Sequence, residues 1–362
     1  MNAFLGHLRP PRIGLGRQVR ARVVAAASLA LAALAVMVAA PASTLTPAAN
    51  AQAPLTIRMS YQPVLIAAPL MVAMEKGYFE QANLNVELNV VWQSAELMAA
   101  FASGNMDAAA GGIGPAQMNA ISRGILNPRL ISPLHTERPP VATPLTVRKA
   151  LWDSGEVRSV ADLKGRKVAL NSKASATEYW LYAALATGGL TPSDVDVVEL
   201  PFPDAVAAMA NGVLDASLIG EPNAVLGEQN GALVRLSEDF IDDFQVTAVY
   251  FDSTFAEKNR PAVEAFLAAY LRGARDLEGD GYRSPENLMI LEKHTKIPAA
   301  TIAASRVPYH DPEGRVHVED FQKLNDFFVA QGVAPALDMA SLVDLSYAEA
   351  ARRLLAEGTR GR

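Results

Sequence analysis

Hydrophobic and polar positions alternate along this chain in two series of short strand-like and longer helix-like segments. At residues 55–59 apolar side chains fall on every second position, as in a half-buried strand. Strands alternating with helices through short connections predict two parallel α/β sheets. In the first series we expect strands at 55–59, 86–91, 107–110 and 130–134 and helices at 65–80, 94–103 and up to 123. In the second we expect strands at 166–170, 195–200, 216–219 and 232–236 and helices at 175–187, 203–211 and 222–230.

The two series predict an α/β fold with two Rossmann-like lobes, of which the first is completed late in the chain. Residues 245–251 are typical of a strand that returns to the first lobe. The C-terminal part beyond this strand has a helical pattern, at 253–278, 284–294, 319–330 and 341–357. The expected division is lobe I at 54–150, lobe II at 151–242 and the second part of lobe I with C-terminal helices at 243–362. We expect the hinge at the two crossings between lobes, near 148–160 and 237–246.

The first 53 residues have the pattern of a secretory signal peptide. Five arginines and no acidic residue precede an apolar run at 23–40, and a small and polar stretch then ends in Ala51-Gln52-Ala53. A transmembrane anchor is the alternative interpretation, but the run is mostly alanine and no charged patch follows it. No two of these five arginines are adjacent, which favours the general secretory route. We therefore expect cleavage near Ala53 and a periplasmic location.

Composition and motifs exclude several classes of function. The chain has no cysteine, which rules out disulfides, thiolate zinc sites and a cysteine nucleophile. Removing residues 1–53 leaves 27 basic against 38 acidic residues, and no basic run remains, so a nucleic-acid partner is not expected. The sequence has no P-loop, no nucleophile elbow and no histidine pair with metal-site spacing. We expect no cofactor and no metal.

Five short segments resemble, in order and spacing, the nitrate/sulfonate/taurine (NMT1-like) group of ABC-transporter binding proteins. They are MEKGYFE at 74–80 with VEL at 86–88, SGNMD at 103–107 with Gly112 and Gly114-Pro115, DLKGRKVA at 162–169, GVLDA at 212–216, and Glu221-Pro222. The resemblance covers about residues 55–275. It implies a periplasmic-binding-protein type II fold with the ligand in the interlobe cleft, and it suggests a monomer. It also implies a membrane permease and an ATPase as partners.

Candidate site residues follow from a rule of open parallel sheets, in which ligands lie beyond the carboxyl ends of strands. Tyr61 and Gln62 come after the first strand. The second is followed by Trp92, Gln93 and Ser94. Ser94 is also expected to cap the next helix.

The remaining candidates lie on three further loops. Gly112 and Gly114 allow backbone N–H groups to approach a ligand. The predicted anion site is the loop with Asn171, Ser172, Ser175, Ala176 and Thr177, which offers hydroxyls, an amide and a helix N-terminus. Glu221 has two open interpretations, contact with a ligand or stabilisation of a helix start. An ionised Glu221 in the cleft would disfavour nitrate and favour a zwitterion or a nitrogenous ring.

Together these patterns favour the substrate-binding component of an ABC importer over an enzyme. We expect it to capture a small anionic or zwitterionic solute, such as a sulfonate, nitrate, a taurine-like compound or a nitrogenous ring, by hinge closure. One alternative is an enzyme on the same fold, of the pyrimidine-synthase or chorismate-dehydratase kind. The absence of cysteine argues against the first of these. The other alternative is a ligand sensor that docks on a receptor.

Overall fold

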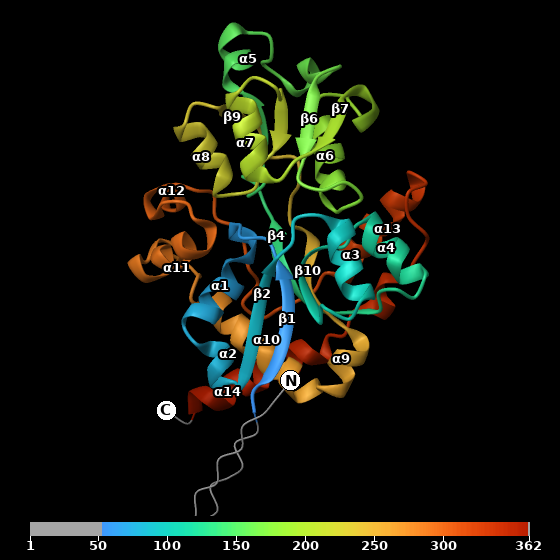
Figure 1. The fold of residues 1–362 in the computed structure, drawn as a ribbon, viewed down its shortest axis with the longest axis vertical. Helices are drawn as coiled ribbons and strands as arrows, with labels where there is room; N and C mark the ends of the chain where they lie inside the picture. The colour runs from blue at the N-terminus through green and yellow to red at the C-terminus, as the bar shows by residue number, and fades with distance from the viewer. Residues whose placement is uncertain (1–52, 361–362) are drawn as a thin grey trace, which may run out of the picture. The chain divides into compact units, whose positions relative to one another are not determined.

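The computed structural model describes residues 53–360, and these residues form two lobes, each built on a five-stranded sheet (Figure 1). The predicted signal peptide lies outside the described residues. The first sheet has the order β2 (Leu84–Val90), β1 (Leu55–Tyr61), β3 (Ala108–Gly112), β10 (Phe244–Asp252), β4 (Pro128–Glu137). The second has the order β7 (Asp196–Glu199), β6 (Lys167–Leu170), β8 (Ala216–Leu218), β5 (Leu145–Arg148), β9 (Leu233–Ser237). The two-lobed α/β fold is therefore confirmed.

Both sheets are mixed, so the prediction of parallel sheets holds for some strand pairs and not for others. β1 pairs in parallel with β2 and β3, and β6 pairs in parallel with β7 and β8. β10 and β5 instead run antiparallel to both of their neighbours. A parallel connection needs a crossover that returns the chain to the same end of the sheet. β5 and β10 each receive the chain directly from the other lobe, and they enter their sheets from the opposite end.

The chain crosses between the lobes twice, at 138–144 after β4 and at 238–243 after β9. The returning strand predicted at 245–251 is confirmed as β10. The second crossing falls inside the predicted 237–246. The first crossing comes earlier than predicted, because β5 and α5 (Lys149–Ser154) already belong to the second lobe. The expected boundary at 150 and the expected hinge near 148–160 therefore lie within that lobe.

Two of the predicted long helices are interrupted. The segment predicted as one helix at 65–80 contains a short 3-10 turn (Leu65–Ala67), α1 (Ala68–Glu75) and α2 (Tyr78–Gln81). Gly77 separates α1 from α2 with a φ of 68°, a left-handed conformation that glycine adopts readily. Asn259 likewise divides the predicted 253–278 helix into α9 (Ser253–Lys258) and α10 (Arg260–Arg275).

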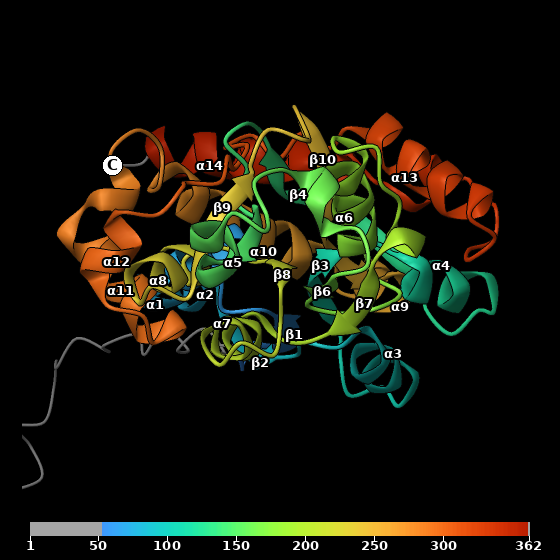
Figure 2. The ribbon, with the colours of Figure 1, turned by 90° about the horizontal axis from the view of Figure 1, so that it is seen from above.

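The other helices are mostly where the pattern places them. In the first lobe they are α3 (Ser94–Ala102), α4 (Pro115–Ser122), α11 (Pro285–Thr295), α12 (Ala299–Ala303), α13 (Val318–Ala330) and α14 (Ser346–Arg360). In the second they are α5, α6 (Thr177–Ala186), α7 (Phe202–Ala210) and α8 (Asn223–Gln229), with α6 on one side of the sheet and α7 and α8 on the other (Figure 2). The pattern predicted neither α5 nor α12. Among residues 53–360 no helix combines the length and apolarity needed to cross a membrane.

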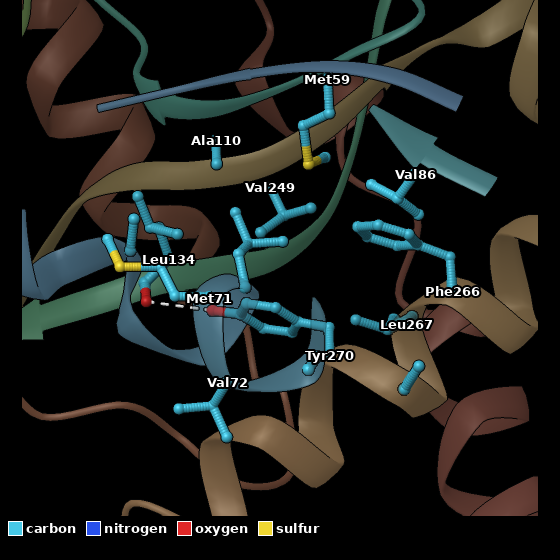
Figure 3. Packing of buried hydrophobic residues seen from close by; sticks show 14 of the residues in the cluster. Met59, Met71, Val72, Val86, Ala110, Leu134, Val249, Phe266, Leu267 and Tyr270 are labelled. Carbon is cyan, nitrogen blue, oxygen red and sulfur yellow. Dashed lines mark hydrogen bonds between the residues drawn. The ribbon is translucent and has the colours of Figure 1, made fainter. Parts of the chain in front are cut away.

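The core of the first lobe lies between its sheet and helices α1 and α10 (Figure 3). Met71 of α1 and Leu267 of α10 are fully buried there beside Val249 of β10. Tyr270 of α10 is 1% exposed and donates its hydroxyl to the carbonyl of Leu134 on β4, at 3.1 Å. α10 is thereby fixed to one of the strands that lead into the crossings.

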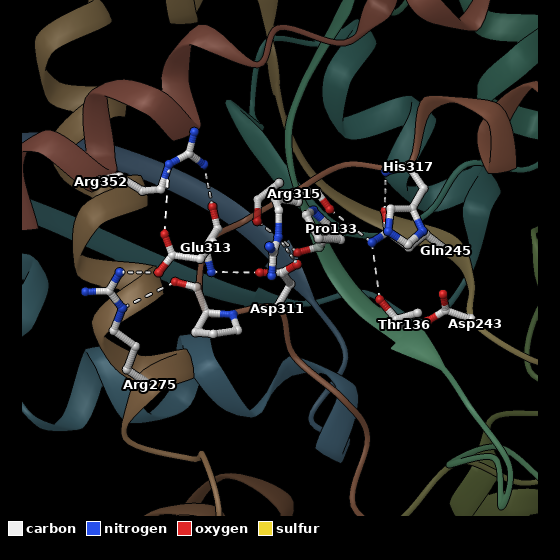
Figure 4. Close-up of polar contacts among 12 residues, drawn as sticks. Pro133, Thr136, Asp243, Gln245, Arg275, Asp311, Glu313, Arg315, His317 and Arg352 are labelled. Atoms are coloured by element: carbon white, nitrogen blue, oxygen red, sulfur yellow. Dashed lines mark hydrogen bonds and ion pairs between the residues drawn. The ribbon is translucent and has the colours of Figure 1, made fainter.

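A polar cluster fastens the segment before α13 to the same strands (Figure 4). Gln245 of β10 donates to Thr136 Oγ1 of β4 at 3.2 Å and to the Arg315 carbonyl at 3.1 Å. It also accepts a hydrogen bond from the His317 backbone N–H at 2.7 Å. β4 and β10, the first-lobe strands at which the two crossings begin and end, are therefore bound to one another and to the segment that precedes α13.

Candidate ligand pocket

A cavity of about 80 Å³ lies where the carboxyl ends of β1, β2 and β3 face β6 and the start of α6. Residues from both lobes line it. Eleven of the thirteen predicted site residues are among them, namely Tyr61, Gln62, Trp92, Gln93, Ser94, Gly112, Asn171, Ser172, Ser175, Ala176 and Thr177. The strand-end rule thus brings together loops that are more than 100 residues apart in sequence. Their role as ligand contacts stays a prediction.

Half of the residues that line the cavity were not predicted from the sequence. The additional residues are Ser60, Ile66, Ala67, Val91, Leu97, Ala110, Gly111, Gln117, Leu134, Trp180 and Thr247. Trp180 follows Thr177 by three positions on α6, so helical periodicity could have found it. Leu134 and Thr247 come from β4 and β10, and only the strand order of the finished sheet places these strands beside the cavity.

Gly114 does not line the cavity, which corrects its assignment as a candidate. Its N–H donates to Gln117 Oε1 of its own helix at 3.1 Å and is not available to a ligand. A Cβ atom at Gly114 would lie 2.3 Å from the carbonyl carbon of Ser175. A Cβ atom at Gly112 would lie 2.6 Å from the Ala176 Cβ. Both glycines therefore allow the lobes to approach closely.

Glu221 is outside the cavity as well. Its carboxylate is buried, pairs with Arg235 at 2.5 Å and accepts from the backbone N–H groups of Arg306 and Val225, at 3.2 and 3.3 Å. Val225 is in the first turn of α8, so the helix-start interpretation agrees with this geometry. Burial raises the pKa of Glu221, against the opposing attraction of Arg235. Because Arg235 balances this charge, Glu221 gives no reason to exclude a simple anion.

Tyr61 and Ser94 line the cavity, but their polar groups have partners that the sequence did not predict. The Tyr61 hydroxyl lies 3.3 Å from Nδ1 of His294, whose Nε2 lies 2.8 Å from Glu75 Oε1, so the tyrosine's polar end is engaged with α11. Ser94 is not the cap of α3, because the helix starts at Ser94 itself and Gln93 takes the cap position. The Ser94 N–H donates instead to Ser172 Oγ, at 3.0 Å. A hydroxyl of lobe II therefore caps a helix of lobe I.

Further hydrogen bonds join the lobes around the cavity. Asn171 Nδ2 donates to Gln62 Oε1 at 3.2 Å. The Ala116 N–H donates to the Ala174 carbonyl at 2.9 Å, and the Leu65 N–H donates to the Glu221 carbonyl at 2.8 Å. With these contacts on several sides of the cavity, the structure shows the lobes closed.

The described residues that line the cavity include no Asp, Glu, Lys, Arg or His. The walls are the rings of Tyr61, Trp92 and Trp180 with several aliphatic side chains, and the polar groups are hydroxyls and amides. Lys173, on the predicted anion loop, is exposed and lies outside the lining, as expected. The arrangement can hold a ligand by ring contacts and hydrogen bonds. It offers no side-chain charge as a counter-ion.

Known proteins resemble this chain over much of its length. The NMT1-like family model matches residues 50–287. The riboflavin-binding protein RibY of Chloroflexus aurantiacus is 28% identical over 249 residues, which are 66% of this chain and 67% of that protein. The taurine-binding periplasmic protein of Escherichia coli is 25% identical, over 65% of this chain and 72% of that protein. The chain spans less than half the length, 46% and 41%, of two other relatives, named for aliphatic sulfonates and for bicarbonate.

A solved structure shares the fold. The ligand-binding component of an ABC-type import system from Staphylococcus aureus superimposes with a TM-score of 0.67 and 20% identity. The match covers 82% of this chain and 98% of that one. The periplasmic-binding-protein type II fold expected from the sequence is therefore confirmed.

Proposed function

This chain belongs to the NMT1-like family, whose model matches more than half of it, and from that premise we propose that it is the extracytoplasmic substrate-binding component of an ABC importer. The observation that carries the proposal is the cavity enclosed by both lobes, which two crossing segments connect in the described part of the chain. A small solute that contacts both lobes would hold them together and shift the population toward the closed form. The closed surface would then dock on a membrane permease and its ATPase.

Three observations support binding rather than catalysis, and a periplasmic location. Among residues 53–360, those that line the cavity include none of the charged, histidine or cysteine side chains that most acid–base and nucleophilic mechanisms use. Two relatives of this chain are named as binding proteins, for riboflavin and for taurine, and the second is named as periplasmic. The N-terminal pattern favours export, with cleavage of a signal peptide near Ala53. On this proposal the protein acts as a monomer and releases its solute unchanged.

A thermal-shift panel with recovery of the ligand tests the proposal. The panel comprises nitrate, bicarbonate, taurine, alkyl sulfonates, aromatic carboxylates, aminopyrimidines and riboflavin. A solute at about 100 times its Kd stabilises the protein by about 2.7 kcal/mol, a shift of several degrees in Tm. We expect one class to give this shift and to be recovered unchanged by mass spectrometry. A compound that is recovered chemically altered would contradict the proposal.

A pair of tryptophan variants locates the binding. Trp92 lines the cavity, whereas Trp152 lies on α5, packs near Arg158 and does not line it. Trp92→Ala should weaken binding of the identified solute at least tenfold, because a wall of the cavity is lost. Trp152→Ala should leave the affinity unchanged. Equal losses in the two variants would show that the ligand binds elsewhere.

A further inference from the structure

One tryptophan of the cavity wall is paired with an aromatic ring of the other lobe. Trp92 follows β2 in lobe I, and Phe202 is the first residue of α7 in lobe II. Their ring centroids lie 5.9 Å apart with an interplanar angle of 75°, an edge-to-face arrangement that aromatic pairs favour. Trp92 lines the cavity, whereas Phe202 is not among its lining residues. Phe202 therefore supports a wall of the cavity without being part of it.

The ring pair belongs to a larger apolar contact between the lobes. Phe202 is 4% exposed and lies in an apolar cluster formed mainly by side chains of lobe II. Three residues of lobe I pack into this cluster, namely the buried Val64 and the partly buried Ile66 and Trp92. Opening of the cleft would return these side chains to water, which is unfavourable for apolar surface. The pairing of Phe202 with Trp92 therefore depends on closure.

Within its own lobe, Trp92 is fixed at the backbone. Gln62 Nε2 donates to the Trp92 carbonyl at 3.2 Å, and this bond leaves the orientation of the indole to packing. Among residues 53–360, Phe202 supplies the one aromatic ring that is paired with this indole. The position of a cavity wall that comes from lobe I is thus set in part by lobe II.

The space for the Phe202 ring depends on a glycine. Gly220, in the loop after β8, is buried and does not line the cavity. A Cβ atom at Gly220 would lie 2.5 Å from Cε2 of Phe202 and 3.3 Å from its Cζ. The φ of Gly220 is not positive, so alanine would fit the backbone but would meet the ring. Glycine at this position therefore leaves the ring free to reach Trp92.

We propose that Phe202 is a positioning residue for solute binding: its ring holds Trp92 across the cleft in the orientation that walls the cavity, and Gly220 provides the space that this ring needs. The inference rests on the proposed function and adds a residue that acts on affinity without touching the solute. Trp92 reaches its final position only when lobe II has approached, which couples the completion of the cavity to closure.

A disulfide between the lobes allows the contact to be tested without any solute. Ser94 Oγ of lobe I and Ser172 Oγ of lobe II lie 3.3 Å apart, so Ser94→Cys and Ser172→Cys together are placed to cross-link the closed form. The chain has no cysteine of its own, so loss of free thiols on oxidation reports the cross-link. Trp152→Phe in the same protein leaves Trp92 and Trp180, and Trp180 is 3% exposed. Quenching of the fluorescence by acrylamide then reports mainly on Trp92.

Two variants disturb the ring pair from different sides. Phe202→Leu keeps an apolar side chain but removes the ring, and Gly220→Ala keeps the ring but must shift it. In the cross-linked protein we expect each variant to raise the acrylamide quenching constant at least twofold, because Trp92 loses its support. Gly227→Ala is the matched control, since its Cβ would lie 2.5 Å from Cδ2 of Leu233 in the same apolar cluster. It crowds lobe II to the same degree and should leave the quenching unchanged.

Affinity shows whether the contact acts on binding. We would titrate the protein without the cross-link, by calorimetry, with the compound of the thermal-shift panel that binds. Phe202→Leu and Gly220→Ala should each weaken binding at least fivefold, and Gly227→Ala should not. Leucine lacks the ring atoms that the alanine would meet, so the double variant should bind no more weakly than Phe202→Leu alone. Additive losses would overturn the role of Gly220.

Two results would overturn the inference as a whole. Unchanged quenching in the cross-linked Phe202→Leu and Gly220→Ala proteins would do so whatever the solute is. Raised quenching with unchanged affinity would show that Phe202 orients Trp92 without acting on binding, which also contradicts the inference. If no compound of the panel binds, the proposed function fails, whereas the cross-linked protein still decides whether Phe202 positions Trp92.

Discussion

Among single residues, His310 offers the clearest test of the buried polar structure. Its Nδ1–H donates to the Leu134 carbonyl at 2.8 Å, so Nε2 must accept the hydrogen bond from the Tyr282 hydroxyl. Burial lowers the pKa of His310 to about 3. Protonation would require a charge in the core and would break the bond from Tyr282. The folded state therefore holds this imidazole neutral.

The sign of the pH effect follows from that depressed pKa. The contribution of His310 to stability is fully present above its unfolded pKa of about 6.5, and it is lost as the pH falls below that value toward 3. The loss is about 1.4 kcal/mol per pH unit. We expect urea unfolding to show His310→Gln less stable than the unsubstituted protein at pH 7.5, with the difference shrinking toward pH 4.5. His317→Gln, at a partly exposed position, is the control, and parallel stability curves for His310→Gln and the unsubstituted protein would contradict the prediction.

For single residues of the candidate site, position could be predicted from the sequence but long-range contacts could not. Residues that follow strands, such as Gln62 and Asn171, could be found because their position depends on the order of elements alone. The surroundings of Glu221 could not be predicted, because its partner Arg235 lies 14 residues further along the chain and meets it only in the folded lobe. The Tyr61 hydroxyl likewise meets His294, more than 200 residues away in sequence. Long-range partners of this kind have no local signal.

Among the elements, α3 depends on the opposite lobe for its N-terminal cap. The Ser94 N–H bonds to Ser172 Oγ, and that hydroxyl belongs to the loop after β6. Opening of the cleft would separate them, so the bond stabilises the closed form selectively. Ser172→Ala should cost the closed form about 1 kcal/mol, which is typical of a lost helix cap. Ligand affinity measured by calorimetry should then fall about fivefold.

The matched control for Ser172 is a serine on the same lobe without a role between the lobes. Ser193 is exposed, and its hydroxyl lies 2.7 Å from that of neighbouring Thr191. Ser193→Ala should leave the affinity unchanged. An affinity in Ser172→Ala equal to that of Ser193→Ala would show that this hydrogen bond makes no contribution to closure.

Most elements could be predicted from the sequence, but their directions and some of their ends could not. Alternation and turn residues located nine of the ten strands described here. β5 was missed because its four residues pass directly into α5 without a turn signal. The antiparallel entry of β5 and β10 depends on which lobe the chain comes from, and local periodicity does not contain that information. Gly77 does carry a local signal, since glycine is common where a helix ends in a left-handed residue.

In the molecule as a whole, closure depends on how closely two backbones can approach. The loop before α4 and the loop before α6 meet beside the cavity, where the Ala116 N–H bonds to the Ala174 carbonyl. Gly112 and Gly114 lie at this contact, and neither has a positive φ, so alanine could adopt either conformation. Glycine is required at these two positions because a side chain would collide with the other lobe, and not because of the backbone conformation.

Gly114→Ala should therefore hold the lobes apart without unfolding either of them. The new Cβ would lie 2.3 and 2.4 Å from backbone atoms of Ser175 and Ala176, which cannot yield as a flexible side chain could. Gly114 does not line the cavity, so any loss of affinity reports on closure and not on a ligand contact. We expect at least a tenfold weaker affinity, a small change in ligand-free Tm, and a radius of gyration in small-angle scattering that stays large when ligand is added. The unsubstituted protein is the reference for closure, because Gly111, whose Cβ position is free of neighbours, lines the cavity. If Gly114→Ala contracted with ligand as the unsubstituted protein does, the contact would not govern closure.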